Sequence, residues 1–132
     1  MQEKDFFDEY CGFVDSLTSE VSKDDALFVE RLKTLSEELK GQFSRFDSAV
    51  AGIAGEAGEI ADLWKKIKFF SKDLTDERKQ DLLLELGDLY WYLAQASNAL
   101  GVKPEEIIKM NMEKLKKRHP QGHFSNAYIT KF

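Results

Sequence analysis

Apolar residues recur every three to four positions along nearly the whole chain, and no stretch alternates in the manner of a β-strand. This pattern predicts an all-α fold, a helical bundle of about five helices. The expected helices cover residues 4–17, a segment that follows Ser22 and ends before Gly41, and residues 47–70, 76–100 and 104–118.

A few residues mark the expected helix ends. Ser22 and Thr75 are placed to cap the second and fourth helices, because a hydroxyl oxygen accepts hydrogen bonds from free first-turn N–H groups. Gly41 and Gly101 are placed to end the same two helices. Pro104 suits the first turn of the fifth helix. Residues 42–45 are then expected to form a connector.

The third and fourth helices each carry a long apolar stripe. These stripes are Ile53, Ala57, Ile60, Trp64 and Ile67 in the third helix, and Leu82, Leu86, Leu89, Leu93, Ala96 and Leu100 in the fourth. We expect the two helices to pair through them, since burying a stripe of this kind is what stabilises an amphipathic helix.

A short acidic pattern occurs once in each of these two helices. Glu56 and Glu59 flank a glycine in the first copy, as Glu85 and Asp88 do in the second. At 100° per residue, each pair lies about 60° and 120° away from its stripe, on the same side. Paired helices would therefore bring four carboxylates together, which is a repulsive arrangement unless cations lie between them.

The chemistry of these ligands favours magnesium. No cluster of histidine or cysteine accompanies the acids, so the donors are oxygen atoms, which suit Mg²⁺ or, as a substitute, Mn²⁺. Gly58 and Gly87 cost helix stability of about 1 kcal/mol each relative to alanine. We therefore expect a backbone or a ligand to approach closely there. The alternative interpretation is a pair of solvated acidic helix faces.

Magnesium held by carboxylates usually acts on phosphates, and the chain offers residues to bind them. Lys65 and Lys66 follow the first acidic pair, and Asn111, Lys114 and Arg118 form a polar stripe on the last helix. Tyr92 is assigned to substrate binding as well. The first helix is rich in aromatic residues that suit a core, yet its Tyr10 and Phe13 offer flat faces to a nucleobase.

Composition narrows the class of protein further. A chain of 132 residues with 42% hydrophobic residues is expected to fold as a single domain over residues 1–132. Its net charge of −5 argues against nucleic-acid binding. No apolar run reaches the length of about 18 residues needed to span a membrane. The lone Cys11 and the acidic, polar N-terminus favour the reducing cytoplasm.

The acidic motifs and the end of the last helix together resemble the MazG-like all-α nucleoside triphosphate pyrophosphohydrolases. The similar segments are residues 51–59, 85–93 and 111–120. The resemblance implies that Glu56, Glu59, Glu85 and Asp88 are catalytic metal ligands. It also implies cleavage of (deoxy)nucleoside triphosphates between the α- and β-phosphates, and assembly into a homo-oligomer, a dimer or a tetramer.

One departure from the family pattern concerns the general base. That pattern has two adjacent glutamates, and the first of them is replaced by Gly55 here. Asp62 is expected to point away from the pair, so the base is left unassigned. Two alternatives stay open. One is a narrow-specificity dUTP, dCTP or phosphoribosyl-ATP pyrophosphohydrolase, and the other is a catalytically inactive regulatory protein that binds nucleotides.

Overall fold

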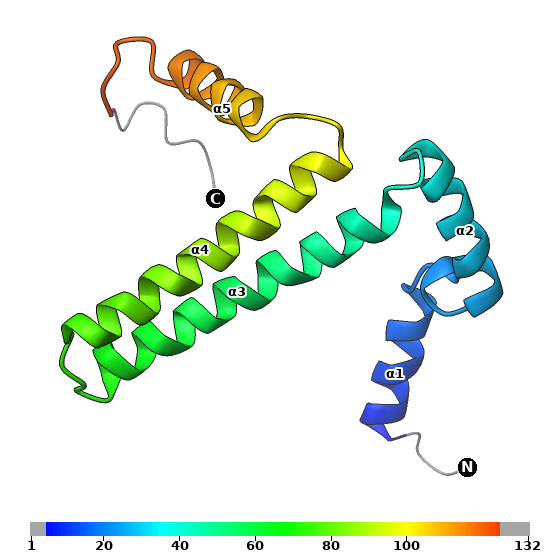
Figure 1. The fold of residues 1–132 in the computed structure, drawn as a ribbon. Coiled ribbons are helices and arrows are strands. Elements are labelled where there is room, and N and C mark those ends of the chain that lie inside the picture. Colours follow the sequence, from blue (N-terminus) through cyan, green and yellow to red (C-terminus); the bar gives the residue numbers. More distant parts are fainter. Residues whose placement is uncertain (1–4, 125–132) are drawn as a thin grey trace. The chain divides into compact units, whose positions relative to one another are not determined.

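The computed structural model describes residues 5–124, and within this range it contains only helices as regular structure (Figure 1). The elements are α1 (Phe6–Ser16), the 3₁₀-helix η1 (Glu20–Ser22), α2 (Asp25–Glu38), α3 (Phe43–Phe69), α4 (Asp76–Ala99) and α5 (Pro104–Arg118). The prediction of an all-α chain with about five helices is thereby confirmed. The predicted first residue of the first helix, Lys4, lies outside the described residues. None of the described helices has the length and apolar character needed to cross a bilayer.

The predicted start of the second helix was wrong. Ser22 belongs to η1, and the cap of α2 is Asp24, whose side chain accepts a hydrogen bond from the backbone N–H of Leu27 at 3.1 Å. A carboxylate at this position also interacts favourably with the positive end of the helix dipole. Ser19 serves as the cap of η1. Two capping residues in close succession produce two helices where one was expected.

The other predicted ends agree with the structure, with one exception. Thr75 caps α4 by accepting from the N–H of Arg78 at 3.2 Å, Gly101 has a φ of +70°, and Pro104 is the first residue of α5. The exception is the connector expected at residues 42–45. The chain reverses at Lys40 and Gly41, with φ of 53° and 80°, and α3 already begins at Phe43.

The chain divides into two compact units, Met1–Phe43 and Ser44–Phe132. In the first unit, α2 packs against η1, and Lys23 links Asp15 and Glu20 through ion pairs of 3.4 and 3.5 Å. The aromatic side chains of α1 are exposed and do not form a core, although aromatic residues on a helix are usually part of one. Tyr10 and Phe13 are 53% and 60% exposed, and their proposed contact with a nucleobase stays a prediction.

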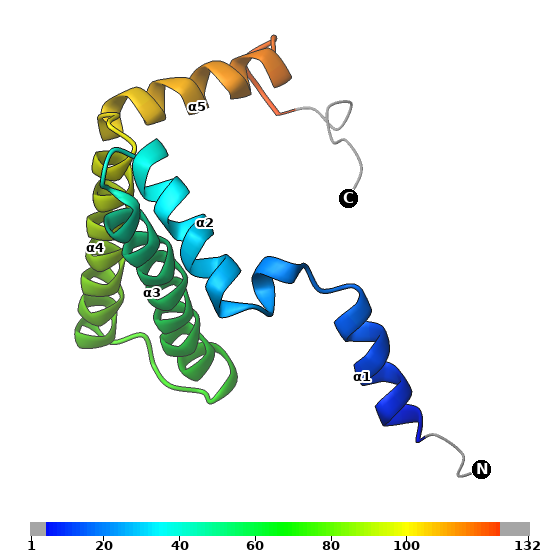
Figure 2. The same cartoon turned by 90° about the vertical axis from the view of Figure 1, so that its right-hand side faces the viewer.

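The second unit is organised by α3 and α4, which run side by side as an antiparallel hairpin (Figures 1 and 2). Arg45 of α3 donates a hydrogen bond to Gln95 of α4 at 3.3 Å. The buried positions in this part of the chain are small: Ala49, Ser97 and Ala99. All three lie near the end of the hairpin where α3 begins and α4 ends.

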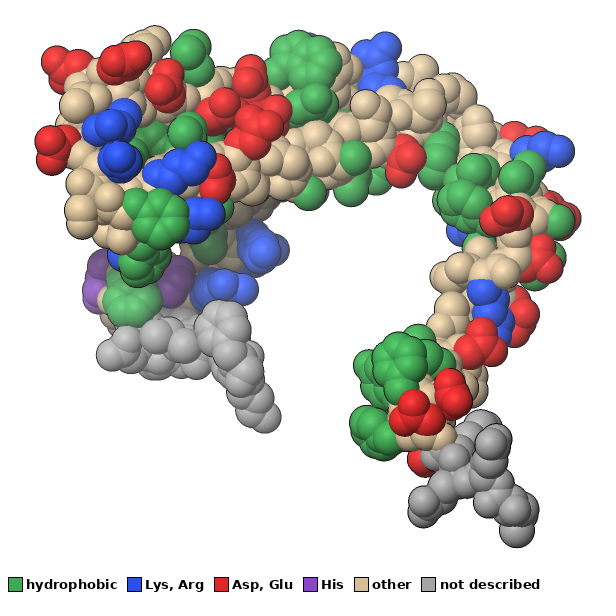
Figure 3. Space-filling model, turned by 90° about the horizontal axis from the view of Figure 1, so that it is seen from below, with side chains coloured by type: hydrophobic (Ala, Val, Ile, Leu, Met, Phe, Trp, Pro, Cys, Tyr) green, Lys and Arg blue, Asp and Glu red, His purple; other side chains and the backbone are tan. Residues whose placement is uncertain are grey.

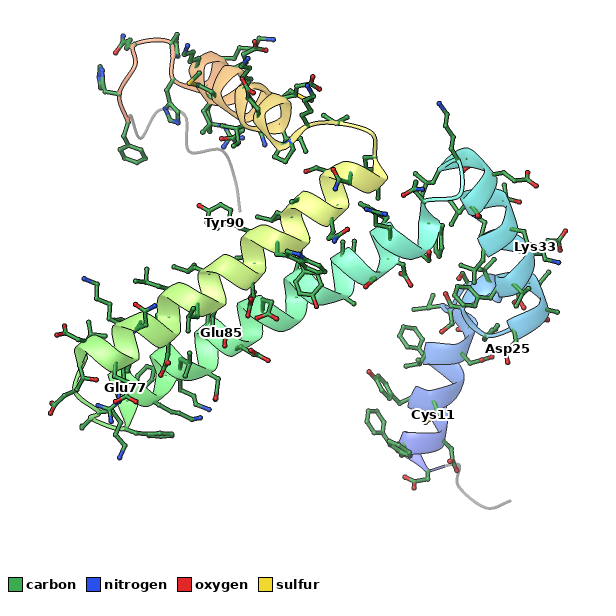
Figure 4. All side chains as sticks on the ribbon, in the orientation of Figure 1. Cys11, Asp25, Lys33, Glu77, Glu85 and Tyr90 are labelled. Carbon is green, nitrogen blue, oxygen red and sulfur yellow. The ribbon has the colours of Figure 1, made fainter. Side chains whose placement is uncertain are left out.

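The stripe predicted for α4 is only partly the face that meets α3. Leu82, Leu89 and Ala96 are half-buried as expected, whereas Leu86 and Leu93 are 41% and 43% exposed. The helix is rotated so that Glu85 takes a half-buried position on the side that runs along α3. Tyr90 lies on the opposite side of α4 and is 72% exposed (Figure 4).

Candidate metal centre

Three of the four predicted carboxylates meet between α3 and α4. Glu56 and Glu59 lie one helical turn apart on α3. Glu85, which is labelled in Figure 4, comes from α4. One carboxylate oxygen from each residue lies within 4.8 Å of the other two. Acids that are far apart in the sequence are therefore brought to one point by the pairing of the hairpin.

The cluster leaves buried carboxylate oxygens without a partner. Oε2 of Glu56 and Oε2 of Glu85 are closed off from solvent, and neither has a hydrogen-bond partner among the described residues. A buried anionic oxygen without compensation is destabilising, unless a cation or a proton neutralises it. The two atoms come from different helices, so one ion between them would satisfy both.

The carboxylates also disturb one another's titration. The neighbouring Glu56 carboxyl is the largest cause that raises the pKa of Glu85 above its usual value. Glu85 in turn is the largest cause that raises the pKa of Glu59, with a smaller contribution from the charge of Asp88. The raised pKa values show that the carboxyl groups of Glu59 and Glu85 are coupled to neighbouring acids, as expected where carboxylates are brought close together.

Asp88 stands apart from this group. Its charge contributes to the raised pKa of both Glu59 and Glu85, so it lies near them, but it is not one of the three residues whose ligand atoms converge. It is exposed on α4. Its assignment as a fourth ligand stays a prediction.

A cavity of about 370 Å³ opens beside the cluster. Its lining is Gly55, Gly58, Glu59, Asp62, Leu63 and Glu85. A Cβ atom added at Gly55 or Gly58 would meet nothing within 4 Å, so the glycines leave this cavity open rather than admit a second backbone. No backbone approaches Gly58 or Gly87 closely, and the close approach of a ligand at these glycines stays a prediction. The glycine in close contact is Gly52, where an added Cβ would overlap the ring of Tyr92.

Asp62 lines the same cavity as Glu59, but it is not one of the three acids whose ligand atoms converge. Its carboxylate forms ion pairs of 2.9 Å with both Lys65 and Lys66. The two lysines lower the pKa of Asp62 to about 2, hydrogen bonding from Lys65 being the largest cause. A carboxylate with so low a pKa is a weak base. The i, i+3 and i, i+4 spacings to the lysines were the sequence signal for this arrangement.

The remaining substrate-binding predictions lie at several places in the fold. Tyr92 packs on Gly52 and meets the Trp91 ring edge-on, with 4.9 Å between ring centroids. Asn111 lines a separate cavity along α5, and Lys114 and Arg118 are exposed on that helix. The lining of the acidic cavity comes from α3 and α4 alone. The roles of the α5 residues therefore stay predictions.

The donor set fits a hard divalent cation. All three converging donors are carboxylate oxygens, two of them have unpartnered buried atoms, and an open cavity adjoins them. Magnesium prefers a few carboxylates and keeps other positions for water or phosphate oxygens. Glu56, Glu59 and Glu85 are thus the residues that would hold such an ion.

Comparison with known proteins gives the family. The model of the MazG nucleotide pyrophosphohydrolase domain matches residues 44–123, which include the whole acidic cluster. The chain is also 45% identical over 73 residues to the Gene 37 protein of Mycobacterium phage L5. That match covers 54% of this chain and 63% of the phage protein. No solved structure matches the chain. Since the family model covers more than half of the sequence, the chain belongs to the MazG nucleotide pyrophosphohydrolase family.

Proposed function

We propose that the chain hydrolyses (deoxy)nucleoside triphosphates to a nucleoside monophosphate and pyrophosphate in a reaction that requires Mg²⁺. The observation that supports this most directly is the convergence of Glu56, Glu59 and Glu85 with two buried, unpartnered oxygens. Membership in the family supports the reaction class.

The reaction exchanges one bond at the α-phosphorus. An oxygen atom of water bonds to that phosphorus, and the bond from the phosphorus to the α–β bridging oxygen breaks. Pyrophosphate leaves with the electron pair of that bond, and a proton from the water is released. When bound, Mg²⁺ would neutralise phosphate charge and make the water more acidic.

The residues of the chain have separate tasks in this scheme. Glu56, Glu59 and Glu85 would hold the cation, with Asp88 as the predicted fourth ligand. Lys65 and Lys66 add positive charge one to two turns beyond Glu59 on α3, and Asp62 fixes their positions through its ion pairs. These lysines would attract the polyanionic part of the substrate toward the acidic cavity.

A panel of nucleotides, with and without Mg²⁺, tests the proposal. We expect pyrophosphate and the nucleoside monophosphate as products, with no orthophosphate or nucleoside diphosphate, and loss of activity in EDTA. The relative rates also separate a broad enzyme from one restricted to dUTP, dCTP or phosphoribosyl-ATP. Release of orthophosphate in place of pyrophosphate would contradict the proposed bond cleavage.

A second candidate is a nucleotide-binding protein without turnover. The observation in its favour is Gly55, which lines the acidic cavity where the family pattern has another glutamate. The absence of hydrolysis from every nucleotide at high protein concentration, together with retained nucleotide binding, would favour this second candidate.

We also propose that the chain assembles as a homo-oligomer through the outer face of α4. Four apolar side chains follow one another along that face at helical spacing, and each is 41–72% exposed: Leu83, Leu86, Tyr90 and Leu93. A second copy offers the same apolar stripe, so a two-fold pairing would cover both. Sedimentation of the wild type and of Leu86→Glu tests this. A wild type that is monomeric at micromolar concentration would contradict it.

A further inference from the structure

A second cavity adjoins the acidic one at the end of the hairpin where α3 turns into α4. It measures about 240 Å³ and is lined by Leu63, Lys66, Ile67, Lys72, Arg78 and Asp81. Leu63 lines both cavities, so the two are neighbours along α3. Figure 3 shows lysine and arginine side chains gathered at this end of the hairpin.

The charges on this cavity favour an anion. Three of its lining side chains are cationic and one, Asp81, is anionic. Arg78 is already oriented, because its Nη1 donates a hydrogen bond to the Asp73 carbonyl oxygen at 2.6 Å. The Nζ atom of Lys72 forms no hydrogen bond or ion pair with any residue between 5 and 124. A ligand would therefore find one fixed guanidinium and one unpaired ammonium group.

The position relative to the carboxylates suits a phosphate chain. Lys66 follows Glu59 by seven residues, which places both on nearly the same face of α3 and about 10 Å apart along its axis. On α4, Arg78 precedes Glu85 by the same number of residues. A triphosphate whose α-phosphate lies at the carboxylate cluster would extend its outer phosphates toward the cationic cavity.

We infer that this cavity binds the two terminal phosphoryl groups of the substrate, which leave as pyrophosphate, and that Lys72 and Arg78 are ligands of these groups. The inference rests on the proposed function for the direction of the substrate. Guanidinium groups bind phosphate oxygens in a bidentate manner, and lysine adds a point charge that is not bound to a protein acid. The cavity would thus select polyphosphates over monophosphates.

Calorimetry with inorganic pyrophosphate, in EDTA, tests the site without catalysis. We expect the full chain to bind pyrophosphate, and Lys72→Gln and Arg78→Lys each to weaken the binding at least fivefold. Arg78→Lys keeps the charge but removes the bidentate geometry. Lys79→Gln, an adjacent change on α4 outside the cavity lining, is expected to stay within twofold of wild type. Circular dichroism checks that each variant keeps its helices.

The possible outcomes separate this inference from the proposed function. Active hydrolysis together with unchanged pyrophosphate affinity in Lys72→Gln would overturn the inference and leave the function standing. The same holds if the wild type does not bind pyrophosphate at millimolar concentration. Pyrophosphate binding that depends on Lys72, in a protein that hydrolyses no nucleotide, would support the polyphosphate site and refute the hydrolase.

Discussion

The ring of Tyr92 on α4 lies directly against the backbone of Gly52 on α3, where no other residue type leaves room for it. This contact lies one turn from Glu56 on α3 and one turn from Asp88 on α4. The spacing of the two helices at the carboxylate cluster therefore depends on it.

Gly52→Ala is expected to destabilise the protein by about 1–3 kcal/mol, because the new methyl group overlaps the Tyr92 ring and the helices must move apart. Urea unfolding measures the change. The matched control is Gly58→Ala on the same helix, where an added Cβ meets nothing within 4 Å. There we expect a gain of about 0.5–1 kcal/mol from helix propensity. Equal effects of both substitutions would refute the contact.

Glu59→Gln and Asp88→Asn are each expected to lower turnover by orders of magnitude while the helical circular dichroism stays the same. Glu59→Gln removes the charge of one of the three converging carboxylates, and Asp88→Asn removes the charge of the predicted fourth ligand. Asp47→Asn, an exposed acid on α3 outside the cavity lining, serves as the control and is expected to keep full activity. Wild-type turnover in Asp88→Asn would remove Asp88 from the ligand set and restrict the centre to the three convergent glutamates.

The stability of the metal-free protein is expected to fall as the pH rises above 4.5, the usual pKa of these glutamates. The pKa values of Glu59 and Glu85 are raised in the folded state, so the fold binds protons more tightly than the unfolded chain does. Their contribution is complete below 4.5 and is lost as the pH passes the raised values. Thermal unfolding in EDTA across this range measures the slope.

Magnesium is expected to reverse that trend. At a concentration one hundred times its Kd, an ion that binds only the folded state adds about 2.7 kcal/mol. The gain is largest at neutral pH, where the carboxylates are ionised and repel one another. Glu59→Gln provides the control, since it reduces both the pH slope and the stabilisation by magnesium. A stability that is independent of magnesium at pH 7 would contradict the metal centre.

Asp62→Asn is expected to retain turnover to within about tenfold. The pKa of about 2 in the wild type means that Asp62 is a poor proton acceptor, and that it stays ionised and paired to Lys65 and Lys66 until the pH falls through that value. General base catalysis is worth 10²–10⁴ in rate, so a loss of that size would assign the base to Asp62. Steady-state kinetics at saturating substrate distinguishes the two results.

Lys114→Ala is expected to raise the KM for the triphosphate severalfold with little change in kcat, because an exposed lysine on α5 would add charge attraction for phosphate. Lys117→Ala, a solvated position on the same helix, is the control. Equal KM values for the wild type and Lys114→Ala would exclude Lys114 from substrate binding.

The helix ends were well predicted wherever one residue dominates the local geometry, as Thr75, Gly101 and Pro104 do. The Ser22 prediction was wrong because Asp24 offers a stronger cap two residues later. The pairing of Glu56 and Glu59 with Glu85 followed from the repeated motif. The rotation of α4 could not be predicted from the sequence, because helical spacing fixes only the angles between side chains of one helix. The orientation of that helix toward its neighbour depends on packing at contacts such as that of Gly52 with Tyr92.

The two unpartnered oxygens belong to Glu56 on α3 and Glu85 on α4, so an ion between them would hold the two helices together halfway along the hairpin. Removal of the ion by a chelator would then loosen the contact between α3 and α4. Without the ion, the like charges of the carboxylates push α3 and α4 apart. We then expect backbone amides near residues 56–59 and 85–88 to exchange with deuterium sooner than those beside Ala49 and Ala99. The availability of free cation would thereby govern how tightly the hairpin closes.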